Sequence, residues 1–321
     1  MIKSRGIVAF ALALACWFGI STNVEGANKI RLDPSSHVVL LGNGLASRMM
    51  LHGYFETELF RRHAKHRLVI RNMADEGNTP GFRPHSGRPS PWAFPGAEKF
   101  YEPLSDAKDR WGSGHMGSGT YESPDAWLTR LKADVIIAFF GYNESFNGAD
   151  GLDSFKDELR SFIRHTRDQS YNGKGNPELA LVSPIAFEDL SESAGTPNGQ
   201  VENANLAIYT AAMEDVASEL NVLFVNAFAA SQKWFDASSK PVTLDGFQLT
   251  SEGNALIAPF LADNLLAPYE ATSVDEAALH AAVQEKNWTW NKLYKSPNGV
   301  HVYGRRHKPC GPDNYPHELK K

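Results

Sequence analysis

Glycines and polar side chains that could bind a ligand or carry chemistry gather in four short stretches of this sequence. Gly42-Asn43-Gly44 follows one apolar run, RNMADEGN (71–78) follows a second, and FFGYNES (139–145) ends a third. Backbone N–H groups of such turns and asparagine side chains donate hydrogen bonds, which stabilise negative charge on an oxygen atom. The fourth stretch, LDGFQLTSEG (244–253), adds a carboxylate and, three residues later, an amide. Together these stretches are the candidate site of this sequence.

These stretches become neighbours only if the apolar runs before them are parallel strands of one sheet. Five β-rich runs alternate with segments of helical period, which predicts an α/β fold, a three-layer αβα sandwich with a five-stranded parallel sheet. The predicted strands are 37–41, 67–71, 134–140, 179–184 and 222–226. The predicted helices are 45–62, 124–132, 152–167, 202–220 and 251–266. Because the carboxyl ends of parallel strands converge on one crevice, we expect the turns to form one site.

The order and spacing of the four stretches resemble the sequence blocks of the SGNH, or GDSL, hydrolase family over residues 37–266. In that family the first block supplies a nucleophilic serine, the second a glycine, the third Gly-x-Asn-Asp, and the last Asp-x-x-His. The resemblance implies that Gly44 replaces the nucleophile, Gln248 replaces the general-base histidine, and Asp245 occupies the position that orients it. It also implies an oxyanion hole made of the backbone N–H groups of Gly44 and Gly77 and the side-chain amide of Asn143.

These replacements remove the usual acyl-enzyme route. Glycine has no nucleophilic side chain, and an amide cannot take up a proton near neutral pH. Loss of a serine triad lowers turnover by about a millionfold, while the oxyanion hole and binding retain roughly a thousandfold over water. We therefore expect a degenerate site that binds an acyl, acetyl-sugar or small oxyanion group, with Asn43 and Asn78 among its binding residues.

Two other functions are consistent with the same residues. The first is ester hydrolysis by a water that Asp245 or Glu144 activates directly, although Glu144 could instead cap a helix terminus. The second is a non-catalytic docking module, in which the aromatic segment 288–315 binds a partner protein. An open pocket would favour binding, whereas a pocket filled by Trp92 or Phe94 would favour docking.

A narrower resemblance rests on AFFGYNESF (138–146), RHTRDQSYNGK (164–174), SPIAFED (183–189) and KNWTWNKLYKSPNGVHVYG (286–304). These segments are similar to an N-terminal SGNH-like module of large exported bacterial proteins, in which a sugar-dehydrogenase-like propeller and a haem-binding segment follow. In that group the nucleophile position is often not serine, but the last block tends to keep its histidine. Because this chain has Gln248 there and shows no propeller sequence, we expect a shortened or split member.

The N-terminus has the pattern of an export signal. Lys3 and Arg5 precede the apolar run 7–20, and small residues near Gly26 suit a cleavage site. The run is too short to span a bilayer comfortably, which favours a cleaved leader (1–26) and a periplasmic or extracellular protein over a membrane anchor. The formal net charge of −5 provides no basic field for nucleic acid.

The rest of the chain is predicted to form an SGNH-like domain (27–270) and a C-terminal region (271–321) with a helix over 274–285 and then an aromatic strap. Residues 76–123 lack periodicity and carry many aromatic side chains, so we expect an ordered cover over the carboxyl edge of the sheet. No metal is expected, because the histidines of RRHAKH (61–66) lie in a basic face. No cofactor is expected, because GNGLAS (42–47) lacks a full dinucleotide-binding fingerprint.

Overall fold

The computed structural model of this protein describes residues 29–83, 92–101, 123–269 and 273–294. At its centre lies a five-stranded sheet with the order β2-β1-β3-β4-β5, in which all neighbouring strands are parallel. The strands are β1 (His37–Gly42), β2 (Val69–Asn72), β3 (Val135–Phe139), β4 (Glu178–Val182) and β5 (Leu223–Val225). The predicted α/β class and the predicted parallel sheet are confirmed.

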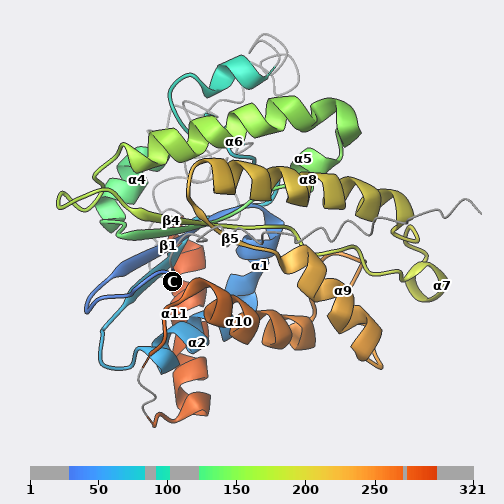
Figure 1. The fold of residues 1–321 in the computed structure, drawn as a ribbon. Coiled ribbons are helices and arrows are strands. Elements are labelled where there is room, and N and C mark those ends of the chain that lie inside the picture. The colour runs from blue at the N-terminus through green and yellow to red at the C-terminus, as the bar shows by residue number, and fades with distance from the viewer. Residues whose placement is uncertain (1–28, 84–91, 102–122, 270–272, 295–321) are drawn as a thin grey trace, which may run out of the picture.

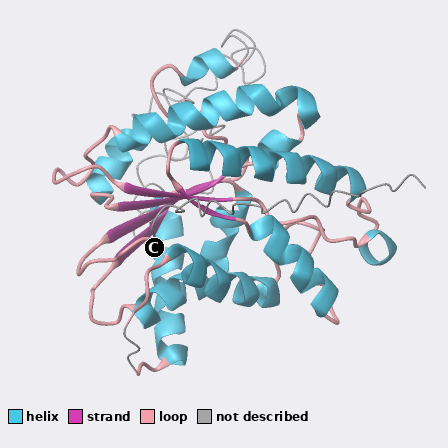
Figure 2. Cartoon of the chain, in the orientation of Figure 1, coloured by secondary structure: helices cyan, strands magenta, loops and turns pink. Residues whose placement is uncertain are grey.

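Helices cover both faces of the sheet, as Figures 1 and 2 show. One face carries η1 (Ala97–Phe100), α4 (Pro124–Leu131), α6 (Leu152–Arg167) and α8 (Gln200–Glu219). The other face carries α1 (Gly44–His52), α2 (Tyr54–Arg62), α9 (Ala227–Ala237) and α10 (Ser251–Leu265). Short helices α5 (Tyr142–Ser145), η2 (Gly148–Gly151) and α7 (Ser191–Ala194) lie in the connections, and α11 (Glu276–Tyr294) packs on α1 and α2.

Each face of the sheet is the centre of its own apolar cluster. Along β1, Val38 and Leu40 belong to the cluster under α1 and α10, while Val39 and Leu41 belong to the cluster under α6 and α8. All four are at most 1% exposed. A parallel strand covered on both faces must be apolar at successive positions, which is why this run was recognisable in the sequence.

The strand order places a switch point at the carboxyl ends of β1 and β3. Leu40 of β1 pairs with Asn72 of β2 on one side and with Ile137 of β3 on the other. The connection after β1 therefore leads to one side of the sheet and the connection after β3 leads to the other side. A crevice opens between these two connections, at the ends of β1 and β3. Gly42 ends β1 with a φ of 118°, and a Cβ atom there would collide with the carbonyl of Phe139. Only glycine allows the turn to start this close to β3.

Several predicted helices differ in extent from those observed. The single helix predicted over 45–62 is two helices, because Gly53 has a left-handed φ of 72° between α1 and α2. Helix α9 was not predicted. The strap prediction is wrong for residues 287–294, which continue α11 as a helix.

The buried face of α11 explains this extension. Val283, Asn287 and Trp290 are buried at helical spacing. The Trp290 indole N–H donates to the carbonyl of Asn72 at 2.7 Å, and the Asn287 amide donates to the carbonyl of Met50 at 3.0 Å. These two hydrogen bonds hold the aromatic part of α11 against β2 and α1.

Two described parts of the predicted cover lie in different places: Glu76 and Gly77 line a pocket at the carboxyl edge of the sheet, whereas residues 92–101 lie beside α6 and contribute to the cluster on that face. Ala93, Phe94 and Ala97 are core residues of this face, and the Phe94 ring stacks on His165 of α6. Residues 84–91 and 102–122 of the cover, the predicted leader and the C-terminal segment after 294 lie outside the described residues. Within the described part of the chain, no helix is both long and apolar enough to cross a membrane.

Candidate functional site

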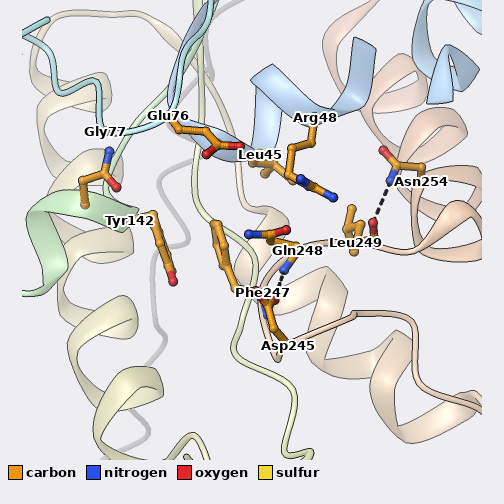
Figure 3. Close-up of a pocket in the computed structure, with 12 residues that line it drawn as sticks. Leu45, Arg48, Glu76, Gly77, Tyr142, Asp245, Phe247, Gln248, Leu249 and Asn254 are labelled. Atoms are coloured by element: carbon orange, nitrogen blue, oxygen red, sulfur yellow. Dashed lines mark hydrogen bonds between the residues drawn. The ribbon is translucent and has the colours of Figure 1, made fainter. Parts of the chain in front are cut away.

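A pocket of about 210 Å³ opens at the carboxyl edge of the sheet, above the ends of β1 and β3. Figure 3 shows its lining side chains, which come from the start of α1, the turn after β2, the start of α5, the turn before α10 and the start of α10. Its walls include five of the predicted site residues: Gly44, Gly77, Asn143, Asp245 and Gln248. The predicted residues Asn43, Asn78 and Glu144 are not among its lining residues.

Gly44 brings the N-terminus of α1 into the pocket wall. It is the first residue of the helix, so its N–H group has no partner within the helix. The positive end of the helix dipole lies at the same terminus. Asn43 is the N-cap: it is 2% exposed, and its side-chain oxygen accepts from the N–H of Leu45 at 3.4 Å. Asn43 therefore fixes the start of α1 rather than facing a ligand.

Asn78 ties the three strand-end turns together. Its side-chain amide donates to the carbonyl of Gly42 at 3.2 Å, and its own carbonyl accepts from the side-chain amide of Asn143 at 2.8 Å. A carboxamide has two N–H donors, so Asn143 keeps one for a ligand. Gly77, just before Asn78, turns with a φ of 79° and is exposed at the pocket wall. The buried Asn78 thus positions the donors.

The fourth turn presents a carboxylate and an amide but no histidine. Asp245 accepts with one oxygen from the N–H groups of Phe247, at 3.1 Å, and Gln248, at 2.7 Å. This contact shapes the turn, and the Asp245 side chain is otherwise exposed. The half-buried Gln248 side chain projects into the pocket in Figure 3. Its amide can donate or accept a hydrogen bond, but it cannot accept a proton near neutral pH.

Glu144 does not face the pocket, which corrects the expectation that it could activate a water there. Its side chain is 4% exposed, and one oxygen accepts from the N–H of Gly141 at 2.9 Å, capping α5. Burial, with a contribution from the nearby charge of Glu158, raises the pKa of Glu144 to about 8. Its role is the structural one, a cap at the start of a helix.

Arg48 and Glu76 line the pocket and were missed by sequence reasoning. Arg48 follows Gly44 by four residues, so both lie on one face of α1. Its buried Nε atom has no hydrogen-bond partner in the described part of the chain. The i, i+4 spacing could have identified Arg48. Glu76 lies in an irregular turn, where no periodicity indicates which way a side chain points.

An aromatic pair forms another part of the wall. The rings of Tyr142 and Phe247 stack with an angle of 12° between their planes, and both residues line the pocket. Burial, followed by the charge of Asp245, raises the pKa of Tyr142 to about 12. Trp92 and Phe94 do not fill the pocket, since they pack against Tyr101 and His165 respectively.

Elsewhere, the described residues contain no group of three or more histidine, cysteine, aspartate or glutamate side chains that could hold a metal ion. His63 and His66 lie next to each other, with ring centroids 5.1 Å apart, in a wall that also includes Arg62 and Lys65. Burial, followed by the nearby His66 and Arg62, lowers the pKa of His63.

No protein-family model matches this chain, and no curated protein matches its sequence. Solved structures do match. A candidate GDSL-like lipase from Parabacteroides merdae is 14% identical with a TM-score of 0.51, over 74% of this chain and 99% of that one. A variant of an acetyl-xylooligosaccharide esterase from Geobacillus is 14% identical with a TM-score of 0.50, over 76% of this chain and 100% of that one. With its parallel sheet and four converging turns, this chain has the fold of the SGNH/GDSL hydrolases.

Proposed function

We propose that this chain binds the carbonyl oxygen of a small ester, an acyl ester or an acetylated sugar, without forming an acyl-enzyme. The observation that carries this proposal is the convergence of Gly44, Gly77 and Asn143 on one open pocket. In the described part of the chain, no serine, cysteine, threonine or histidine lines that pocket. The donors of an oxyanion hole are thus retained where the nucleophile and the base are replaced.

The size and composition of the pocket limit the ligand. At about 210 Å³, it is smaller than the roughly 300 to 1,000 Å³ of sites that enclose drug-sized ligands. It therefore suits an acetyl or other short acyl group with part of the attached alcohol. The half-buried ring of Tyr142, which stacks on the buried Phe247, offers an apolar surface for the carbon face of a sugar. An open pocket also favours ligand binding over a docking module with a vestigial crevice.

Calorimetry with an acetylated xylo-oligosaccharide and its deacetylated counterpart tests this proposal. We expect binding of the acetylated form only, and about fivefold weaker binding by Asn143→Ala, because a neutral hydrogen bond contributes about 1 kcal/mol. The matched control is Asn264→Ala, which removes an exposed asparagine near the far end of α10. Equal binding of both sugars, or equal loss in both variants, would contradict the proposal.

Export is part of the same proposal. The basic start, the apolar run 7–20 and the small residues near Gly26 support a leader that is cleaved before the described domain begins. Expression with the full N-terminus, followed by fractionation and mass measurement of the mature chain, tests it. We expect a periplasmic or secreted protein that starts near residue 27. A full-length chain in the membrane fraction would show an uncleaved anchor.

A further inference from the structure

Glu76 borders the space that a nucleophilic side chain would occupy. A Cβ atom built on Gly44 would lie 3.7 Å from Cγ of Glu76; apart from the two chain neighbours and the backbone of α1, no other atom of the described residues comes within 4 Å. Beyond that Cβ position the pocket is open. The carboxylate carbon of Glu76 is bonded to Cγ, so the carboxylate borders the same open space, and a water there can donate a hydrogen bond to it.

The three acidic residues considered for this site differ in what their carboxylates contact. Glu144 is buried and caps α5, and Asp245 holds the turn before α10 with two N–H groups. The carboxylate of Glu76 has no hydrogen-bond or ion-pair partner in the described ranges, and its side chain is exposed at the pocket. Figure 3 shows it running along the start of α1, beside Leu45 and towards Arg48.

We propose that Glu76 is the general base of a slow, non-covalent ester hydrolysis in this pocket. The inference rests on the proposed function, because the ester must first bind to the donors of Gly44, Gly77 and Asn143. Arg48 adds a positive charge to the same wall, which favours the oxyanion that forms.

The step balances with water as the only co-reactant. Glu76 takes a proton from the water while the water oxygen bonds to the carbonyl carbon of the ester. At the same time the electrons of the C=O π bond move to the carbonyl oxygen. That oxyanion is held by the N–H groups of Gly44 and Gly77 and by the amide of Asn143. When the C=O bond re-forms, the C–O bond to the alcohol breaks, and the alcohol oxygen takes the proton from Glu76. The products are a carboxylic acid and an alcohol, and Glu76 is again ionised.

Steady-state hydrolysis of 4-nitrophenyl acetate and of an acetylated xylo-oligosaccharide tests the role of Glu76. We expect Glu76→Gln to lower kcat by about a hundredfold or more with little change in KM, because general-base catalysis contributes about 10²- to 10⁴-fold. Added formate should restore part of the activity of Glu76→Ala, which a structural role would not produce. Glu252→Gln, an exposed first-turn residue of α10, is the matched control and should match the wild type.

The outcomes separate this inference from the proposed function. Binding of the acetylated sugar by the wild type without hydrolysis would overturn the inference and leave the proposed function standing. Wild-type activity in Glu76→Gln, or loss of activity only in Asp245→Asn, would also overturn it. A mass increase of the protein by one acetyl group during turnover would show a covalent route instead. Absence of both binding and hydrolysis would contradict both proposals.

Discussion

Replacing Gly44 by serine and Gln248 by histidine together should convert the pocket into a covalent acyl-transfer site. The structure accepts the first change. Gly44 is a helical residue outside the left-handed region, and its added Cβ would make an ordinary van der Waals contact of 3.7 Å with Glu76. Serine is also a better helix former than glycine, by about 0.5 kcal/mol. The second change retains the backbone hydrogen bond from residue 248 to Asp245, measured at 2.7 Å.

The expected gain can be bounded from the behaviour of serine triads. A complete triad is worth about a millionfold in turnover, and its members act as a unit, so each single variant should gain little. A misplacement of about 1 Å costs roughly a hundredfold, and two side chains are introduced without further adjustment. The wild type has the proposed general base Glu76, so the gain is measured against Glu76→Gln, which lacks it. We expect at least about a hundredfold gain in 4-nitrophenyl acetate hydrolysis by the double variant over Glu76→Gln.

Three readouts of the double variant test this reasoning. They are the rate, a burst of 4-nitrophenol equal to the enzyme concentration, and labelling of residue 44 by a fluorophosphonate. Thermal unfolding of all variants serves as the control for folding. A double variant that folds with an unchanged midpoint, yet neither labels nor gains activity, would refute the claim that these four turns keep the geometry of a hydrolase site.

Two further predictions concern the framework that positions the donors. Gly42→Ala should destabilise the fold by about 3 kcal/mol or more in urea unfolding, because the added Cβ would clash with the Phe139 carbonyl and because residue 42 has a φ of 118°. A loss of unfolding free energy below about 1 kcal/mol would mean that the turn relaxes easily. Glu144 has a folded-state pKa of about 8, above its unfolded value of 4.5, so its contribution to stability is present below 4.5 and is lost as pH rises towards 8. Glu144→Gln should remove this decline in the free energy of unfolding, which is at most about 1.4 kcal/mol per pH unit. If the variant and the wild type show the same slope of unfolding free energy between pH 5 and 8, the prediction is wrong.

The sheet could be predicted because its signal is local. Strands such as β1 are buried on both faces, so their residues are apolar in succession, and the runs of the central strands β1 and β3 end at the turn glycines Gly42 and Gly141. The convergence of Gly44, Gly77 and Asn143 was expected from one topological rule, that carboxyl ends of parallel strands meet. The 245–248 turn follows α9 rather than a strand, so its place beside them was expected only from the resemblance to the sequence blocks of the family.

The features that sequence reasoning missed depend on the direction of single side chains. Glu144 lies one residue after Asn143, yet α5 turns it into the interior, where it caps the helix instead of facing the crevice. Glu76 projects from an irregular turn, and its closeness to Gly44 follows from tertiary packing that no periodicity encodes. The end of α11 was missed because its aromatic residues were interpreted as a strap, although Val283, Asn287 and Trp290 follow a helical spacing.

Titration of ¹⁵N-labelled protein with an acetylated xylo-oligosaccharide, followed by NMR, tests the ester-binding pocket most directly. Hydrogen bonds to a carbonyl should shift the backbone N–H signals of Gly44 and Gly77 and the side-chain amide of Asn143 along one saturable curve, while the deacetylated sugar leaves all three unchanged. If those three signals stay fixed while others move, the ligand binds elsewhere, and the pocket at the ends of β1 and β3 is not the ester-binding site.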